Sequence, residues 1–236
     1  MYPTAQECAI ISEAEKIMQD AMARYDPSHD AFHVQRVRKT ALAIANSLSP
    51  KPDLLVVELA ALLHDVLDKK YVSPEQASDP YGFFLPFFTS AATAHGLDLV
   101  QDGRARQIAQ IVDNVSWSTE TKLRKSNQWS KWHMDCVELH CVQDADRLDA
   151  IGAFGIMRCA AYSAAVKRPL YVPAGEHASE ESAIQHFHDK LVLIHERLKT
   201  EPGKLLGKKR HRVLLEFLSS VEDEYNPPVL SGVGRA

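Results

Sequence analysis

Apolar residues recur with helical spacing along most of the chain. Val34, Val37, Ala41, Ile44 and Leu48 follow one another at steps of three or four residues, which places them on one face of a helix. No stretch of useful length alternates between apolar and polar residues as a half-buried strand does. The pattern therefore predicts an all-α fold, a bundle of about eight to ten helices.

Two segments show where such helices begin. Thr4 and Glu7 have the spacing of a capping box and precede the apolar face of a first helix. Asp53 precedes residues 54–63, which are apolar on nearly every side. A helix without a polar face belongs in the centre of a bundle, and we expect this helix there.

Other segments interrupt the pattern. Residues 71–88 hold three prolines and an aromatic cluster, and we expect an ordered loop, a lid or short helical turns. The polar residues 116–131 predict a loop with a mobile tip. Residues 182–198 and 205–221 predict a final helical pair, separated by Glu201-Pro-Gly203.

The domain organisation follows from the lack of a linker. We find no internal repeat or linker between helical segments, so residues 1–225 are expected to form a single domain. Residues 226–236 contain two adjacent prolines and two glycines, and we expect them to be a flexible C-terminal tail.

Composition narrows the class of protein. The chain has 236 residues, of which 45% are hydrophobic, and its net charge is −4. Such a chain can bury a large core but lacks the basic excess of a nucleic-acid or membrane-surface binder. It also lacks an apolar run long enough to span a membrane, and we expect no signal peptide. We therefore expect a soluble, cytoplasmic or otherwise intracellular protein whose four cysteines are reduced core thiols.

The first candidate for chemistry is His64-Asp65, at the end of the apolar segment 54–63. A buried carboxylate needs a partner, and a divalent metal or a buried arginine would serve. The alternative is that both residues only end the helix, where an aspartate is poorly placed against the helix dipole. His-Asp also occurs at 29–30 and 188–189, so the dipeptide alone is weak evidence.

The second candidate is the acidic run at Asp144, Asp146 and Asp149, which lies between apolar residues. On a helix Asp146 and Asp149 share a face, and Asp144 points away. We expect Asp146 to be the better metal ligand and Asp149 to cap a helix that begins at Ala150. The alternative is a salt-bridged helix start.

These residues occur in an informative order. His33, then His64 and Asp65, then Asp146, in the strings HDAFHVQRV (29–37), LLHD (62–65) and DADRLDAIG (144–152), resemble the HD-domain metal-dependent phosphohydrolase superfamily. The closest likeness is to a single-domain bacterial and fungal subgroup associated with nucleoside triphosphate pyrophosphohydrolysis. The resemblance covers about residues 25–225. It is specific for the fold and the metal site, and less so for the substrate.

The resemblance implies one divalent metal, held by residues matching His33, His64, Asp65 and Asp146. Two imidazoles and two carboxylates suit a transition metal, with Mn²⁺ first and Ni²⁺, Co²⁺, Fe²⁺, Zn²⁺ or Mg²⁺ as alternatives. The metal would activate a water molecule and offset charge at the attacked phosphorus. His29, Asp30 or Asp68 could serve a second metal, which some relatives bind.

The resemblance also suggests roles beyond the ligands. Asp68 is expected to act as general acid or base, although relatives often have Glu there, and Lys70 is expected to take part in catalysis and contact a phosphate. Arg36, three residues after His33, and Arg147 could bind substrate phosphates. Each arginine could instead pair with an acid, such as those of the run at 144–149.

The function that follows is hydrolysis of a nucleoside or deoxynucleoside triphosphate to monophosphate and pyrophosphate. The alternatives on the same metal site are a 5′-nucleotidase and a phosphodiesterase. Outside enzymes, a non-catalytic nucleotide-binding regulatory module or a purely structural bundle would have the same helical pattern. The expected partner is a small nucleotide, and a homodimer is possible for an apolar bundle of this size.

Overall fold

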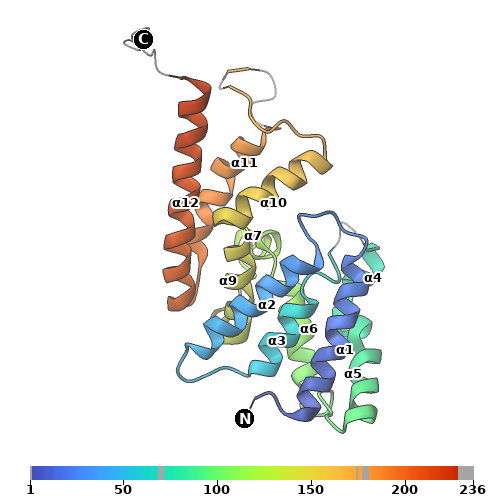
Figure 1. The fold of residues 1–236 in the computed structure, drawn as a ribbon. Helices are drawn as coiled ribbons and strands as arrows, with labels where there is room; N and C mark the ends of the chain where they lie inside the picture. The colour runs from blue at the N-terminus through green and yellow to red at the C-terminus, as the bar shows by residue number, and fades with distance from the viewer. Residues whose placement is uncertain (1, 69–71, 174, 177–180, 228–236) are drawn as a thin grey trace, which may run out of the picture.

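The computed structural model describes residues 2–68, 72–173, 175–176 and 181–227. Those residues contain helices and no strand, so the predicted all-α fold is confirmed for the part of the chain that is described. The helices, labelled in Figure 1, are α1 (Ala5–Met22), α2 (Ala31–Asn46), α3 (Leu54–Leu63), α4 (Pro74–Ser78), α5 (Pro80–His95), α6 (Arg104–Asn114), α7 (Trp117–Lys125), α8 (Lys131–Asp135), α9 (Val137–Asp149), α10 (Gly152–Ala165), α11 (Ala183–Asp189), the 3₁₀ helix η2 (Leu191–Arg197) and α12 (Glu201–Tyr225).

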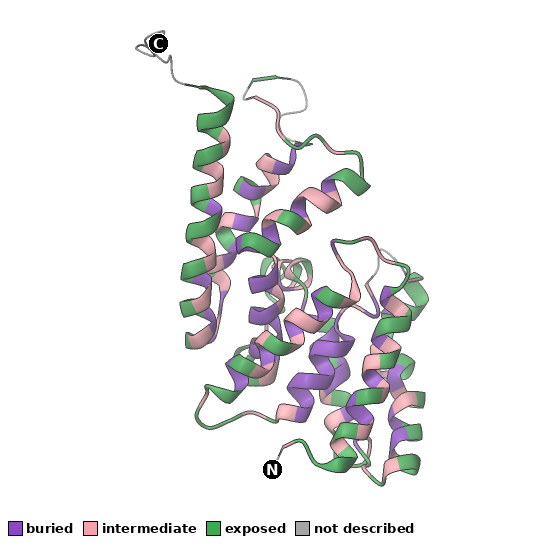
Figure 2. Ribbon diagram, viewed as in Figure 1, coloured by how far each residue is buried: buried purple, intermediate pink, exposed green. Residues whose placement is uncertain are grey.

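Helix α3 occupies the centre of the larger group of helices, as its sequence predicts. Every residue of α3 except Leu54 is buried, and Figure 2 shows the helix purple along almost its whole length. Helices α1, α2, α6 and α9 pack against it. Asp53 caps α3 by accepting hydrogen bonds from the backbone N–H groups of Leu55 and Val56, at 3.0 and 3.2 Å.

Three helices near the C-terminus form a second group. Helices α10, α11 and α12 lie together in the upper left of Figure 1, on the far side of α9 from α1 and α5. Helix α10 packs on α12, and both contact α9, so α9 joins the two groups. A break at Ala150 and Ile151 separates α9 from α10, and Gly152 takes up the turn with a φ of +74°.

The prediction for residues 71–88 is wrong over its second half. Helix α4 is short, as expected, but α5 runs for 16 residues and passes through Pro86. Phe84, Phe88 and Ala91 form a buried stripe at helical spacing, and α5 packs against α6. Burial of this stripe outweighs the backbone hydrogen bond that Pro86 cannot donate.

The predicted loop at 116–131 contains a helix instead. Ser116 begins α7 by accepting a hydrogen bond from the backbone N–H of Thr119 at 3.1 Å. Most of α7 is polar, and its buried residue is Glu120, which pairs with Arg147 and Lys199. Apolar periodicity missed this helix because its contacts with the rest of the molecule are a buried ion pair and the single aromatic ring of Trp117, and not a continuous hydrophobic face.

The last part of the chain also differs from the prediction. Glu201-Pro-Gly203 does not separate two helices but begins α12, where Thr200 accepts a hydrogen bond from the backbone N–H of Gly203 at 3.0 Å. Proline is well tolerated in a first helical turn, which explains this start. Residues 182–198 form α11 followed by η2 rather than one α-helix.

The cysteines follow the prediction with one exception. All four are free thiols, and Cys136, Cys141 and Cys159 are buried. Cys8 is exposed on α1, so it is not a core thiol. No helix within the described residues has an apolar stretch of the length that a bilayer crossing requires.

Candidate metal centre and active-site cavity

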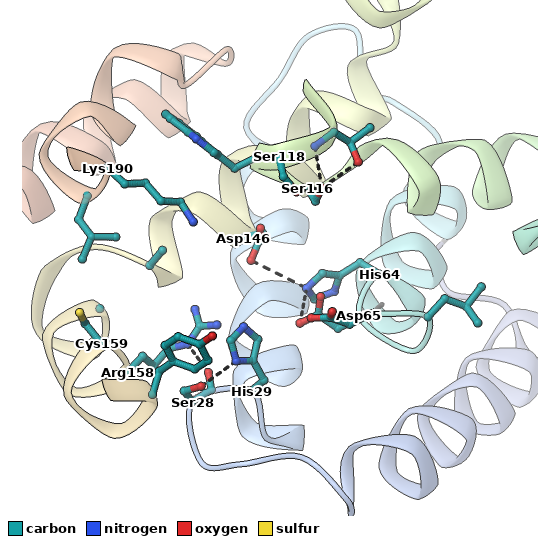
Figure 3. A pocket seen from close by; sticks show the side chains of 18 of the residues that line it. Ser28, His29, His64, Asp65, Ser116, Ser118, Asp146, Arg158, Cys159 and Lys190 are labelled. Carbon is teal, nitrogen blue, oxygen red and sulfur yellow. Dashed lines mark hydrogen bonds and ion pairs between the residues drawn. The ribbon is translucent and has the colours of Figure 1, made fainter. Parts of the chain in front are cut away.

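Four side chains from three helices meet at one point, which we call the metal centre: His33, His64, Asp65 and Asp146. His33 comes from the first turn of α2, His64 and Asp65 from the end of α3, and Asp146 from α9. One ligand atom from each of His33, His64 and Asp146 lies within 4.8 Å of the others. Figure 3 shows His64, Asp65 and Asp146 converging. The packing of α2 on α3 and α9 therefore assembles residues that lie up to 113 positions apart.

The carboxylates lie close to both imidazole rings. Asp65 Oδ2 is 3.3 Å from Nε2 of His33 and 3.4 Å from Nε2 of His64. Asp146 Oδ1 is 3.7 and 3.9 Å from the same two nitrogens. These separations are too long for good hydrogen bonds but suit donor atoms arranged around a common centre.

Each ring is oriented by its other nitrogen. Nδ1 of His33 lies 2.7 Å from Oδ2 of Asp149, and Nδ1 of His64 lies 2.8 Å from the carbonyl oxygen of Ala61. Among the described residues, the buried Nε2 atoms of His33 and His64 are without a hydrogen bond. An acceptor beside Nδ1 favours the proton there and leaves the Nε2 lone pair available, as in metal-binding histidines.

The charges of the site favour a cation at this point. Burial of the His64 imidazole lowers its pKa, but the Asp65 and Asp146 carboxylates outweigh burial and raise the pKa to about 9. Burial of the Asp65 carboxylate acts to raise its pKa, but the neighbouring His64 and His33 outweigh burial and hold that pKa well below its ordinary value. Two buried Nε2 atoms and two carboxylates thus fit a divalent metal by geometry and by charge.

Asp149 supports the metal centre, and the prediction that it caps the next helix is wrong, because Ile151 is the N-cap of α10. Asp149 is the last residue of α9, and its buried carboxylate accepts hydrogen bonds from Nε and Nη2 of Arg36 at 2.8 and 3.0 Å. Arg158 of α10 contacts the same carboxylate at 3.2 Å. These cations and His33 hold the pKa of Asp149 far below its ordinary value, despite burial, which raises it. Asp149 therefore stays ionised beside His33.

Asp144 points away from the metal centre, as its helical position predicts. Its buried carboxylate accepts hydrogen bonds from the backbone N–H groups of Lys199 and Thr200, at 2.9 and 2.7 Å, and from the Thr200 hydroxyl at 2.7 Å. Gly203 lies so close that a Cβ there would collide with the Asp144 carboxylate. Asp144 thus fixes the start of α12.

The two arginines predicted as phosphate ligands have protein partners. Arg36 forms the bidentate pair with Asp149 described above, and its guanidinium lies over the Phe154 ring. Arg147 is buried and pairs with Glu120 and the carbonyl oxygen of Arg197. Neither side chain lines the cavity described next, so the contacts favour the ion-pair alternative for both. Lys70 lies outside the described residues and stays a prediction.

A cavity of about 630 Å³ opens beside the metal centre. On one side lie His64, Asp65 and Asp146, with Asp68 and His29 nearby. A second side, from α3 to α7, is partly apolar. Its residues are Leu67, Ala77, Pro80, Val112, Asp113, Ser116, Trp117, Ser118 and Thr119.

The third side of the cavity carries positive charge. We call four of the lining residues the cationic wall: Arg158 from α10, Arg168 just after α10, His186 from α11 and Lys190 just after α11. In Figure 3, Lys190 and Arg158 extend toward the space beside Asp146. Burial lowers the pKa of His186, and Lys190 and Arg168 lower it further, so both cations lie near that ring.

Sequence reasoning did not assign the cationic wall. No role for Lys190 or His186 followed from the sequence. Arg158 and Arg168 lie in a weakly patterned stretch, where a basic residue usually indicates only a solvated face. No local signal marks these residues, because tertiary packing alone brings α10 and α11 to the metal centre.

Comparison with known proteins identifies the same family that the sequence motifs resemble. The HD domain family matches residues 31–151, more than half of the chain. The uncharacterized protein YpgQ of Bacillus subtilis is 31% identical over 222 residues, covering 91% of this chain and 94% of YpgQ. The crystal structure of YpgQ in complex with ADP has a TM-score of 0.66 at 26% identity and covers 96% of this chain and all of that one.

A second relative carries a functional description. An HD-superfamily hydrolase from Bacillus thuringiensis matches with a TM-score of 0.68 at 25% identity, covering 94% of this chain and 100% of the other. Within the stretch matched by the family, His33, His64 and Asp146 meet between α2, α3 and α9 in a geometry that could hold a metal ion. This chain therefore belongs to the HD domain family and is a metal-dependent phosphohydrolase.

Proposed function

We propose that the enzyme hydrolyses a nucleoside or deoxynucleoside triphosphate to the monophosphate and pyrophosphate. The observation that carries the proposal is that one cavity contains both the metal centre and the cationic wall. A polyphosphate chain needs several positive groups along its length, whereas a single phosphate needs fewer. The ADP bound in the crystal structure of YpgQ supports a nucleotide as ligand.

The size and lining of the cavity suit a nucleotide. Its volume of about 630 Å³ is within the range of small-molecule sites, which runs from about 300 to 1,000 Å³. The partly apolar side from α3 to α7 offers Leu67, Val112 and Trp117 to a base or sugar, and Ser118 and Thr119 offer hydroxyl groups. A nucleoside on that side would leave its phosphates near the metal centre.

The metal that fits the site is a divalent cation, for which we propose Mn²⁺, with Asp65 as fourth protein ligand beside His33, His64 and Asp146. When bound, such a cation lowers the pKa of water and offsets phosphate charge. His33 and His64 hold their Nε2 lone pairs toward the site because Asp149 and the Ala61 carbonyl oxygen fix the opposite nitrogens.

We assign proton transfer to Asp68, which lines the cavity beside His64 and Asp65. The oxygen of water bonds to the α-phosphorus, and the bond from that phosphorus to the bridging oxygen breaks with its electron pair kept by pyrophosphate. One proton of the water passes to Asp68, and the other leaves the product phosphate for the solvent.

Product analysis tests the proposal. The Mn²⁺-loaded protein is incubated with nucleoside tri- and monophosphates, and the products are separated by ion-exchange chromatography, with Asp65→Ala as control. We expect pyrophosphate and monophosphate from the wild type and neither from the variant. Inorganic phosphate released from monophosphates alone would move the assignment to a 5′-nucleotidase. Absence of turnover with every metal would favour a binding module.

A further inference from the structure

The charges around the cavity are unevenly distributed. Asp68 and Asp113 line the side near α3 and α6, in addition to the carboxylates of the metal centre. The cations that line the cavity are Arg158, Arg168 and Lys190, and Figure 3 shows Lys190 across the space from His64 and Asp65. Phosphate groups are repelled by the carboxylates wherever no cation intervenes, so a polyphosphate chain has one favourable direction, from the metal centre toward α10 and α11.

Arg168 and Lys190 form a local pair within the cationic wall. They come from different segments, Arg168 just after α10 and Lys190 just after α11. Both line the same cavity as His186 and Cys159, and in keeping with this each lowers the pKa of the His186 imidazole and opposes the rise that burial gives to the pKa of Cys159. Two cations around one point are suited to a diphosphate group.

Arg158 has a different part, because protein groups already hold its guanidinium. Its Nε donates to the carbonyl oxygen of Ser28 at 2.6 Å, and Nη1 contacts Asp149 at 3.2 Å. Through Asp149 it connects the cavity with the hydrogen bond that orients His33. We therefore treat Arg158 as a positioning residue of the metal centre.

We propose that Arg168 and Lys190 form a subsite for the β- and γ-phosphates, which holds the pyrophosphate leaving group of a nucleoside triphosphate. This inference rests on the proposed function and adds the orientation of the substrate. The nucleoside lies toward Val112 and Trp117, and the α-phosphate lies at the metal centre. The two cations stabilise the negative charge that develops on the bridging oxygen as its bond to the α-phosphorus breaks.

The opposite orientation is less favourable. It would place the uncharged base against Arg168 and Lys190 and the phosphate chain against Asp113 and the apolar side chains. Both the desolvation of the two cations and the repulsion between anions would oppose binding.

The test compares inhibition by inorganic pyrophosphate with inhibition by a nucleoside monophosphate, in the Mn²⁺-loaded protein. The variants are Arg168→Gln and Lys190→Met, with Lys208→Met as the matched control, since Lys208 is exposed on α12 and does not line the cavity. For each cavity variant we expect the inhibition constant of pyrophosphate to rise about tenfold or more and that of the monophosphate to change less than twofold. Lys208→Met should change neither.

Retained inhibition by the monophosphate shows that a variant is folded with an intact metal centre. Equal weakening of both inhibitors, or unchanged inhibition by pyrophosphate, would overturn the subsite. Isothermal titration with pyrophosphate separates this inference from the function on which it rests, because binding needs no turnover. Suppose that the wild type produces no pyrophosphate in the activity assay but binds added pyrophosphate, and that Arg168→Gln loses this binding. The proposed reaction is then wrong, and the anion subsite stands.

Discussion

The metal centre and the cationic wall face the same cavity but are held in different ways. His33 and His64 are almost fully buried, with side-chain exposures of 0% and 1%, and a second hydrogen bond orients each ring. Arg168 and Lys190 follow the ends of α10 and α11 and stay partly exposed. Metal coordination requires donor atoms at fixed positions, whereas long cationic side chains can follow a phosphate. The difference therefore reflects what each ligand demands.

The largest effect is expected from a change within the metal centre. Asp146→Asn removes a carboxylate charge beside both Nε2 atoms, so we expect metal affinity and hydrolysis to fall more than about 100-fold, beyond the range typical of outer partners. Metal content after purification and initial rates with added Mn²⁺ measure this. Normal rates at low Mn²⁺ would remove Asp146 from the ligand set.

A smaller effect on metal affinity is expected from a change at Asp149, which contacts His33 of the metal centre. Asp149→Asn weakens the hydrogen bond that orients His33 and leaves Arg36 and Arg158 without their shared anion. We expect a loss of about 10- to 100-fold in metal affinity, as outer-shell substitutions commonly give. Asp135→Asn, at an exposed position on α8, is the control. A titration with Mn²⁺ checks the result, and an unchanged affinity would show that packing alone orients His33.

The connection between the two regions is tested through Arg158. Arg158→Lys keeps the charge but cannot contact both Asp149 and the Ser28 carbonyl oxygen through a planar fork. We expect about a 3- to 10-fold decrease in kcat/KM with metal content unchanged, since Arg36 still holds Asp149. Steady-state kinetics measured together with metal analysis decide the matter. Loss of metal in this variant would place Arg158 among the supports of the metal centre itself.

Substitution of Glu120 is expected to have the smallest effect on hydrolysis. It is expected to have a clear effect on the free energy of unfolding. Burial raises the pKa of Glu120, but Arg147 and Lys199 outweigh burial and lower the pKa to about 2 from its ordinary 4.5. The folded state therefore gains stability above pH 4.5, and this gain is lost as the pH falls toward 2, because the unfolded chain takes up the proton first.

Glu120→Gln lacks this titration and leaves Arg147 without its charge partner. We expect it to unfold about 3 kcal/mol more easily at pH 7, with a difference from the wild type that narrows as the pH falls below 4.5. Urea unfolding at several pH values measures the difference, and hydrolysis should change less than twofold. A constant difference from pH 7 to 3 would contradict the shifted pKa.

The sequence pattern predicted the central helix and the residues that meet at the candidate metal centre, for a physical reason. Residues 54–63 are apolar on all sides, so they must be buried, and His64-Asp65 follows directly. The position of Asp146 on α9 likewise separates it from Asp144 by a helical rotation, and the structure places the two on different sides. These features are local, and local spacing is enough to predict them.

The sequence pattern gave wrong predictions where contacts between residues distant in the sequence determine the structure. Helix α7 exists because Glu120 meets Arg147 and Lys199 from α9 and the segment before α12, and nothing in its own sequence marks that contact. Asp149 looked like a cap because its neighbours suit one, yet Arg36 and Arg158 draw its carboxylate into the support of His33. In both cases the partners are distant in the sequence.

The sequence by itself determined the helical class, the buried α3 and the residues of the candidate metal centre, because each depends on spacing within one helix or on a motif with a fixed order. Only the tertiary structure decided which arginines face the cavity. Arg36 and Arg147 were as good candidates as Arg158 and Arg168 by residue type, but an arginine turns toward whichever anion the packing of helices brings within reach. Contacts between helices therefore determine which anion each arginine pairs with, and the spacing of residues along the chain does not predict these contacts.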